Sequence, residues 1–405
     1  MLVEGSVTAR TGRKARIAAQ DSRPTGDMSM RNPFLSHVAL SLRQSRPRLS
    51  AEPLTTVNRE TVGGRPFVRL WFTTAGCTHD RRGRCTMCNY GTGEPADTES
   101  MIHAAALDLS RWGCTHGTLL VSPSGSMFDE REVEPRTRRP LLTLAASTDF
   151  ERILVETRPE TITDAVLSES IALLPGKQLE VEIGLESSDP WILRWCVNKG
   201  LQLGQVVRAL DFCTAHGVTS IVNVSLGTAF LTEAEAIVDA VGATRWAFAQ
   251  GATEVVVFPL SVRGWTVLQH MYDRGRYRPV SLWSLVEVLR RLGREAAARV
   301  SISWYRDYNA DDDSSSPLQV LAAPTTCARC VGDVLERLDG YRDSQDFTII
   351  TDLSQHPCSC RQEWLSGLAQ APTQPLGQRV QDEYRALAIE IGLGYAPSDG
   401  PVVHP

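Results

Sequence analysis

The stretch FVRLWFTTAGCTHDRRGRCTMC, residues 67–88, joins an apolar run to three closely spaced cysteines. Residues 67–74 are rich in β-branched and aromatic side chains, which predicts a strand. Cys77, Cys85 and Cys88 follow in the loop behind this strand, separated by seven and then two residues. The next cysteine, Cys114, lies in different surroundings. The stretch therefore predicts a buried strand followed by a metal-binding loop with three thiolate ligands.

Beyond this loop the chain alternates short apolar runs with longer helical patterns. We expect strands at 67–74, 116–125, 151–160, 179–188, 219–228 and 253–262, and helices at 101–113, 163–176, 189–200, 205–217, 232–251 and 281–297. Asp189 is the expected N-cap of the third of these helices, with Pro190 at its first position. Such alternation indicates parallel strands joined by right-handed crossovers.

No glycine-rich dinucleotide fingerprint follows the first strand, so a β/α barrel is favoured over an open sheet. We predict an α/β fold: a partial (β/α)6 TIM-like barrel with a small C-terminal cysteine-rich module. Active sites of such barrels lie on the loops after the strands, which is where the three cysteines are. The expected domains are a basic, partly disordered extension (1–55), the barrel (56–300), and the cysteine-rich module with a helical tail (301–405).

Composition narrows the class of protein. The 405 residues carry a net charge of −5 and are 42% hydrophobic, which is typical of a globular protein with no overall attraction to nucleic acid. The basic residues of the first fifty positions are the exception, and an arm for nucleic acid or a partner is the alternative to a disordered extension. No run of apolar residues predicts a membrane span, and the N-terminus has no secretory h-region. We therefore expect a cytoplasmic protein.

Ten cysteines in a cytoplasmic chain indicate metal or redox chemistry more than disulfides. Three thiolates leave one iron of a 4Fe-4S cluster open to a small chelating ligand, whereas a structural metal is normally closed by a fourth side chain. The alternative for the first group is zinc with His79 as the fourth ligand.

Further segments follow in a consistent order. They are SPSGSMFDE (122–130), ETRPE (156–160), EIGLESSDPWILRWCVNKG (182–200), FLTEAEAIVDAV (230–241), YRPVSLWSLVEVL (277–289), and the pairs CARC (327–330) and CSC (358–360). With these segments the chain resembles the radical SAM superfamily, its Elongator/MiaB-like branch, and within it the archaeosine-synthase radical SAM subunits. The cysteine spacing, C-x7-C-x2-C, departs from the usual C-x3-C-x2-C.

The resemblance implies a 4Fe-4S cluster on Cys77, Cys85 and Cys88, with S-adenosylmethionine chelating the unique iron. An electron from a donor such as flavodoxin or ferredoxin would cleave the cofactor reductively, and the resulting 5′-deoxyadenosyl radical would abstract hydrogen from the substrate. The expected cofactor-binding residues are Tyr90, Gly125, Ser126, Glu156, Arg158, Glu186, Lys199, Asn223 and Ser225. Each has a structural alternative, such as core packing for Tyr90 or a salt-bridged strand end for Glu156 and Arg158.

The second cysteine group, Cys327, Cys330, Cys358 and Cys360, forms two close pairs. Two pairs of cysteines predict tetrahedral zinc, and the small module around them needs such a link in order to fold. The helical pattern at VGDVLERL (331–338) and the strand-like DFTII (346–350) lie between the pairs. An auxiliary iron–sulfur cluster is the alternative.

The substrate is predicted less directly. Outside the first fifty residues the chain has little clustered positive charge, which favours a small amino-acid-like or nucleoside-like metabolite whose C–N or C–C bond is cleaved or rearranged. The archaeosine-type alternative is a tRNA-modifying lyase acting on a 7-deazaguanine-lysine nucleotide. A third alternative, of another class, is a non-catalytic zinc scaffold.

Overall fold

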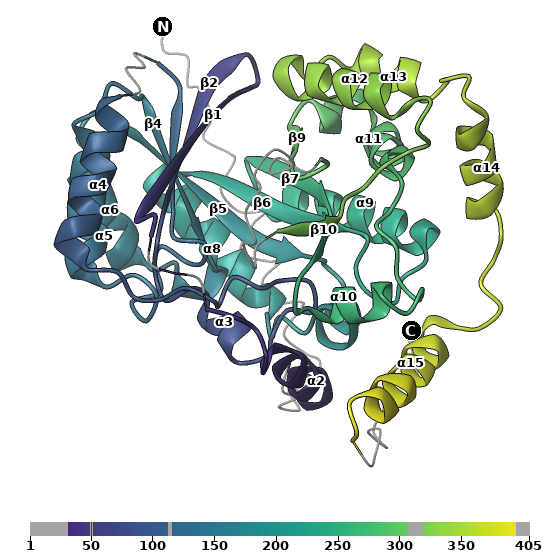
Figure 1. Ribbon diagram of the computed structural model, residues 1–405. Helices are drawn as coiled ribbons and strands as arrows, with labels where there is room; N and C mark the ends of the chain where they lie inside the picture. Colours follow the sequence, from purple (N-terminus) through teal and green to yellow (C-terminus); the bar gives the residue numbers. More distant parts are fainter. Residues whose placement is uncertain (1–30, 49, 51, 112–115, 307–318, 394–405) are drawn as a thin grey trace, which may run out of the picture.

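The computed structural model describes residues 31–48, 50, 52–111, 116–306 and 319–393. Its centre is a curled eight-stranded sheet in the order β1-β2-β3-β4-β5-β6-β7-β9 (Figure 1). The strands are β1 (Thr55–Val62), β2 (Arg65–Phe72), β3 (Thr118–Ser122), β4 (Arg152–Thr157), β5 (Gln178–Glu186), β6 (Thr219–Leu226), β7 (Glu254–Pro259) and β9 (Val300–Ile302). From β2 onward all neighbours are parallel, and β1 is antiparallel to β2. The predicted partial β/α barrel is confirmed.

Helices cover the outer face of the sheet, with α4, α5 and α6 at one side and α9 and α11 at the other (Figure 1). They are α4 (Thr98–Ser110), α5 (Pro135–Ala146), α6 (Asp164–Leu173), α8 (Leu203–His216), α9 (Glu233–Ala249) and α11 (Leu282–Ala297). Thr232 caps α9 through a capping box, as its sequence predicts. Strand side chains alternate between two faces, so every second residue packs against these helices in the main core.

The inward-facing side chains form a separate, smaller cluster. Leu120, Leu154 and Ile221 meet there, with Phe67 and Val256 against them. The five residues come from five different strands, and they make an apolar floor across the inside of the curled sheet. Two residues further along, towards the carboxyl ends, four of these strands carry a polar residue and β7 carries Phe258; the polar residues are Arg69, Ser122, Glu156 and Asn223.

The segment expected as a helix at 189–200 is shorter and less regular than predicted. Asp189 does cap it, by accepting from the backbone of Trp191 and Ile192, and Pro190 is at its first position. The helix α7 (Pro190–Ile192) passes at once into a π-helical turn, η2 (Leu193–Val197), which ends at Asn198 in the left-handed conformation. This turn brings the backbone of Cys196 to Asn198 against the cysteine loop.

From Val331 to Glu390 the regular elements are all helices: α12 (Val331–Ser344), α13 (Phe347–Leu353), α14 (Ser359–Leu368) and α15 (Leu376–Glu390). The expectation of a strand at 346–350 is wrong. Asp346 caps α13 by accepting from Thr348, and Ile350 and Leu353 supply a one-sided apolar stripe that packs on α11. A short apolar run carries no reliable period, and here the capping residue decided the structure.

α12 lies between the two edges of the open sheet. The Tyr341 hydroxyl donates to the carbonyls of Ala297 and Val300, at the β9 edge, at 2.9 and 3.1 Å. At the β1 edge, the Arg342 carbonyl accepts from Gly63 at 3.0 Å and its guanidinium pairs with Glu60 at 3.3 Å. One helix thus connects the first and last strands of the partial barrel.

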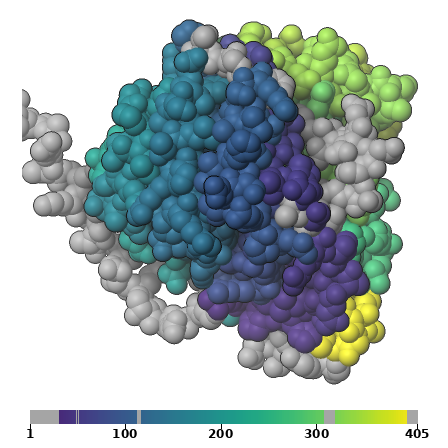
Figure 2. All heavy atoms as spheres, turned by 60° about the vertical axis from the view of Figure 1, so that its left-hand side comes forward, coloured from purple at the N-terminus to yellow at the C-terminus, as the bar shows by residue number. Residues whose placement is uncertain are grey.

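The two ends of the described chain meet below the barrel. Helix α2 (Pro33–Arg43) and α15 share a second apolar core with α10 (Val267–Tyr272). Tyr384 of α15 packs on Phe34 and accepts from the Asn32 amide at 2.7 Å. The space-filling view shows the yellow C-terminal helix beside the purple N-terminal segments (Figure 2). Sequence analysis did not predict α2; the remaining part of the basic extension, 1–30, lies outside the described residues.

The remaining elements are short connections: α3 (Thr78–Arg81), η1 (Pro159–Thr161), and the small sheet of β8 (Val262–Arg263) and β10 (Val320–Ala322). Among the described residues no helix is both long and apolar enough to cross a membrane.

Candidate active site

The three-cysteine loop leaves the carboxyl end of β2. Cys77 is the N-terminal flanking residue of α3, and its backbone N–H donates to the Tyr90 carbonyl at 2.9 Å. Gly76, just before it, has φ +78°, and a Cβ there would lie 2.1 Å from that same carbonyl oxygen. Only glycine allows this close crossing of the two ends of the loop. The crossing fixes a closed loop that contains all three cysteines.

Arg43, from α2, holds this loop from outside the barrel. Its buried guanidinium donates to the carbonyls of Asp80, Arg84, Cys85 and Cys88 at 2.7 to 3.2 Å, and pairs with the Asp80 carboxylate at 2.9 Å. The planar guanidinium presents its donors in a fixed fork, so it can satisfy several carbonyls at once. Sequence analysis missed this residue, because nothing in the pattern places α2 against the loop.

The π-helical turn after β5 supports the loop from a second side. The Cys85 and Thr86 backbone N–H groups donate to the carbonyls of Asn198 and Val197 at 3.3 and 3.1 Å. The Asn198 amide donates to the Gly83 carbonyl at 3.2 Å and its oxygen accepts from Asn32 at 2.9 Å. The irregular backbone of this turn is what frees the carbonyls that the loop uses.

Arg158, after β4, is the centre of an ion-pair network next to Cys77. Its guanidinium pairs with Asp129, with Glu132 at 2.7 Å and with Glu160 at 2.9 Å. Glu132 in turn accepts from the Thr78 N–H and hydroxyl, each at 2.7 Å. These contacts go to Glu132 and its neighbours, and none of them goes to Glu156. The Arg158 guanidinium also lies 3.7 Å from the Cys77 sulfur.

Gly125 and Ser126 lie beside this network. A Cβ at Gly125 would lie 2.4 Å from the Glu132 carboxylate and 3.6 Å from the Cys77 Cα. The Ser126 N–H donates to Glu132 at 2.7 Å, and its buried hydroxyl is within 2.6 Å of the Thr157 hydroxyl. Close packing against the Glu132 carboxylate therefore explains why a glycine is needed at position 125. Sequence analysis quoted the segment SMFDE (126–130) but did not single out Asp129, which pairs with Arg158.

Glu186 and Lys199 form a buried pair at the carboxyl end of β5. The Lys199 ammonium donates to Glu186 at 2.8 Å and to the Gly184 carbonyl at 2.7 Å. Burial would lower the pKa of Lys199, but the Glu186 charge outweighs it and raises that pKa. Glu186 adopts φ +72°, and its second carboxylate oxygen is buried without a hydrogen-bond partner. Ser225 donates to the Glu186 carbonyl at 3.3 Å.

Glu156 lies deeper, on the inward face of β4 opposite Glu182 of β5. Ser122 donates to Glu156, and Glu182 bonds Asn223 on the next strand. Burial raises the pKa of both carboxyl groups, that of Glu182 to about 8. Sequence analysis singled out Glu156 and Asn223 and missed Glu182. Strand alternation alone could have found it, because Glu182 and Glu186 are four residues apart and so share one face of β5.

Tyr90, two residues beyond the last cysteine of the loop, is half-buried. Burial raises the pKa of its phenol, and Arg263 lies over its ring at 5.4 Å from the centroid. Tyr90 therefore lies between the cysteine loop and the inner carboxylates.

The three loop cysteines are half-buried and free. Burial raises the pKa of each thiol, that of Cys85 to about 12, because the apolar surroundings disfavour a thiolate. Within the described residues, only the four C-terminal cysteines bring their ligand atoms within 4.8 Å of one another. The loop sulfurs are more widely spread, as they must be when each binds a different iron of one cluster.

His79 does not complete a zinc site. Its Nε2 contacts Arg84 at 2.8 Å and Glu160 at 3.2 Å. Burial lowers the pKa of His79 to about 4, so the ring is neutral at physiological pH. The ring supports the Arg158 network through Glu160, and the zinc alternative for this loop has no support from the geometry.

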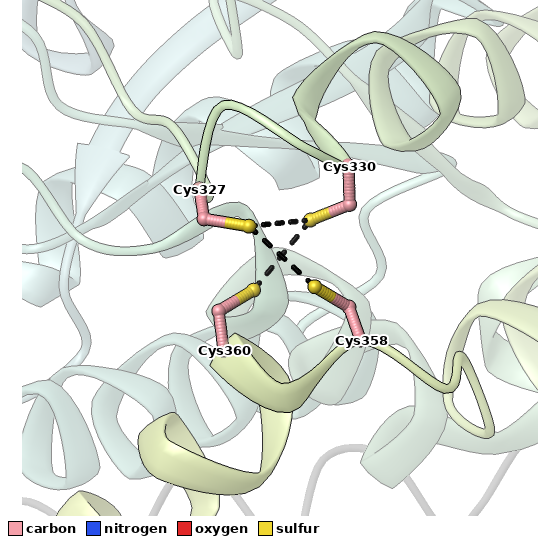
Figure 3. Close-up of side chains that lie close together, drawn as sticks. All are labelled: Cys327, Cys330, Cys358 and Cys360. Atoms are coloured by element: carbon pink, nitrogen blue, oxygen red, sulfur yellow. Dashed lines mark hydrogen bonds between the residues drawn. The ribbon is translucent and has the colours of Figure 1, made fainter.

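The second cysteine group is a compact cluster (Figure 3). Sulfur–sulfur distances are 3.6 Å for Cys327–Cys330, and 3.5 Å for both Cys327–Cys358 and Cys330–Cys360. Tetrahedral zinc, with bonds of about 2.3 Å, places its sulfurs about 3.8 Å apart. Cys330 and Cys358 flank the N-termini of α12 and α14. The donor set and spacing fit one ion better than a cluster of four irons.

Neighbouring side chains orient this group. The Trp283 indole N–H donates to the Cys360 sulfur at 3.4 Å. His356, which lies close by, accepts from the Cys358 N–H at 3.2 Å and contacts Asp333 at 3.2 Å. Both ring nitrogens are therefore used, and His356 is a supporting residue beside the four sulfurs.

Comparison with known proteins adds sequence relatives. No family model matches the chain. It is 29% identical to archaeosine synthase subunit beta of Methanosarcina acetivorans, over 82% of this chain and 94% of the relative. It is 27% identical to the protein of the same name from Thermococcus kodakarensis, over 76% and 94%. The solved structure of methylornithine synthase aligns with a TM-score of 0.44 at 14% identity, over 76% of this chain and 86% of that one.

The partial barrel, with a three-cysteine loop at its carboxyl end, is the arrangement that the resemblance to the radical SAM superfamily implied. In sequence the chain is similar to the archaeosine synthase β subunits over most of the length of both proteins, as the sequence segments predicted.

Proposed function

We propose that Cys77, Cys85 and Cys88 hold a 4Fe-4S cluster and that the enzyme cleaves S-adenosylmethionine reductively to start hydrogen abstraction from an amine-bearing substrate. The observation that carries the proposal is the loop itself: three free thiols, spread too widely for one ion, inside a loop whose two ends cross at Gly76. When bound, the cluster and S-adenosylmethionine would supply the radical chemistry. Neutralisation by iron would also offset the burial that opposes ionisation of the thiols.

The protein's own groups hold the loop and meet the cofactor. Arg43 and Asn198 fix the loop backbone from two sides. Gly125 adds no side chain of its own beside Cys77, and the unpartnered Glu186 oxygen offers an acceptor at the barrel mouth. Lys199 pairs with the other oxygen of Glu186, and the unpartnered oxygen suits an ammonium or a ribose hydroxyl of the cofactor.

Two substrate classes fit this proposal. A small amino-acid-like or nucleoside-like metabolite is favoured by the net charge of −5 and by the pairing of arginines such as Arg138, Arg276 and Arg379 with carboxylates. A 7-deazaguanine-lysine nucleotide in tRNA is favoured by the similarity to archaeosine synthase subunit beta. Salt-dependent binding of tRNA would separate the two.

Anaerobic reconstitution tests the proposal. We expect the wild-type protein to take up iron and sulfide, to become brown, and to release 5′-deoxyadenosine with dithionite. The Cys85→Ala variant should do neither, whereas Cys213→Ala, at a buried lone cysteine of α8, should behave as wild type. Colourless wild-type protein that carries zinc at the loop would refute the proposal and favour the non-catalytic scaffold.

We also propose that Cys327, Cys330, Cys358 and Cys360 bind one structural zinc ion. Support comes from the sulfur spacing and from the indole N–H that points at Cys360. Metal analysis of the reconstituted Cys85→Ala variant isolates this site: one equivalent of zinc without iron supports it, and iron with sulfide would support the auxiliary cluster instead.

A further inference from the structure

The inside of the barrel is open to solvent. Along β5 the outward side chains Val181, Ile183 and Leu185 are fully buried, whereas the inward Glu182 and Glu186 are half-buried. The same alternation holds on the neighbouring strands, where Glu156, Asn223 and Phe258 face inward and are half-buried. Outward residues contact helices, so the exposed fraction of the inward residues means that the described residues do not fill the space above the apolar floor.

This space has more hydrogen-bond acceptors than donors. The Glu156 and Glu182 carboxylates lie opposite each other on adjacent strands. The buried Asn223 amide oxygen, on the next strand, has no hydrogen-bond partner. The nearest positive charge on the pair is that of Arg69, which is itself paired with Glu60. A buried acceptor without a donor is costly, so the arrangement calls for a ligand that brings donors.

The pair lies further down β5 than Glu186. Glu186 marks the mouth of the barrel, where its second oxygen and Lys199 lie near the cysteine loop. Glu182 is four residues earlier on β5, with a register irregularity between Gly184 and Glu186, and the Glu186 carboxylate and the Lys199 ammonium lie beside Gly184. Leu154 of the apolar floor precedes Glu156 on the inward face of β4, and Glu180 precedes Glu182 on β5. A ligand that enters from the mouth therefore passes Glu186 and Lys199 before it reaches the pair.

We propose that Glu156, Glu182 and Asn223 form a site for a primary alkylammonium group of the substrate. An alkylammonium presents three N–H donors at the end of an apolar chain, which matches two carboxylates and one amide oxygen above an apolar floor. The inference rests on the proposed function, because it assumes that the substrate enters the barrel below the cofactor. It moves Glu156 from the cofactor, where the resemblance placed it, to the substrate.

A metal ion fits this place less well. Among the described residues, these carboxylates do not form a group of three ligands within 4.8 Å, which a divalent ion would need. Burial raises the pKa of both carboxyl groups, and an arriving ammonium would lower them again because it stabilises the ionised pair. The charged groups that face the pair are Arg69 from β2, Glu180 below it on β5, and Tyr90 and Glu186 above it.

The test uses n-butylamine, which is charged at neutral pH, and n-butanol, which has the same chain without the charge. Binding to the full-length protein is measured by saturation-transfer NMR. We expect the amine to bind in preference to the alcohol. Affinity for the amine should fall by about ten-fold or more in Glu182→Gln and Glu156→Gln. It should not change in Glu151→Gln, a control at an exposed glutamate just before β4.

Two results would overturn the inference: equal binding of amine and alcohol by the wild-type protein, or amine binding that survives both glutamine substitutions. The wild-type comparison stands even if a variant fails to fold. Release of 5′-deoxyadenosine is measured separately in the reconstituted enzyme. If that release is absent while the amine still binds selectively, the proposed function fails and the amine site remains.

Discussion

Single buried charges decide how the cysteine loop is held. Arg43 donates to four carbonyls of the loop, two of them those of the cysteines Cys85 and Cys88. No motif in the sequence marks this arginine, because its partners are backbone atoms some forty residues away. The cysteines themselves were predictable from spacing, whereas the residue that shapes their loop depends on how α2 packs.

Replacing Arg43 by lysine should therefore weaken cluster loading. The four carbonyls lie around the planar guanidinium of Arg43, and the compact ammonium of a lysine, with three donors, cannot bond all four. We expect a loss of about 3 kcal/mol in unfolding free energy and a marked fall in iron and sulfide bound after reconstitution. The control is Arg82→Lys, an exposed arginine of the same loop. Iron content and stability equal to wild type in Arg43→Lys would contradict this role.

Glu180 gives a second prediction at this scale. Burial raises the pKa of Glu180 to about 7, from an ordinary value of 4.5. The stabilisation by its protonated form is complete below the unfolded pKa and is lost as pH rises through the folded pKa. As pH rises from 4.5 to about 7, the unfolding free energy of the wild-type protein should fall by on the order of 3 kcal/mol relative to that of Glu180→Gln. Unfolding free energies of both proteins across this pH range measure it, and parallel profiles would disprove it.

At the scale of elements, the strand–helix alternation was predictable and the irregular pieces were not. Every expected barrel strand is present, because buried parallel strands and amphipathic helices have distinct periods. The π-helical turn at Leu193–Val197 was read as ordinary helix, since its sequence continues the helical pattern beyond Asp189. Its form is set by the loop that it supports, which is a tertiary effect. The strand expected at 346–350 is a helix instead, because Asp346 caps it and a short apolar run does not by itself specify a strand.

Asn198 ends this turn and is the place to test it. The residue has φ 56°, and its side chain bonds Asn32, Ser36 and Gly83. Asn198→Ala should lower the unfolding free energy more than Asn198→Gly, by about 1 kcal/mol, because alanine resists the left-handed conformation. Both variants lose the same side-chain bonds, so their difference reports the backbone alone. Equal stabilities would mean that the turn relaxes to another conformation.

For the whole molecule, the C-terminal module closes the barrel. A partial barrel has two free edges, and exposed edges are sites of unwanted pairing. α12 covers both, through Tyr341 at β9 and Arg342 at β1. The sequence predicted the cysteine pairs and a small module but gave no indication that the module spans the sheet, because the contacts join residues far apart in the chain.

The four-cysteine group then has a mechanical consequence. Cys330 is the residue before α12, and Cys358 and Cys360 tie α14 to it across the sulfur cluster. Removing the proposed zinc ion would leave four close thiols and release the start of the helix that joins the two edges. We expect chelation to lower the unfolding free energy by several kcal/mol and to raise hydrogen exchange at β1 and β9 together, because both edges depend on α12. Hydrogen exchange by mass spectrometry, with and without the chelator, measures this.

Cys360→Ser should reproduce the effect without chelator, whereas Cys213→Ala should not. If exchange rises only in the segments around the cysteines, and β1 and β9 keep their protection, then the module folds independently and the barrel is closed without the metal.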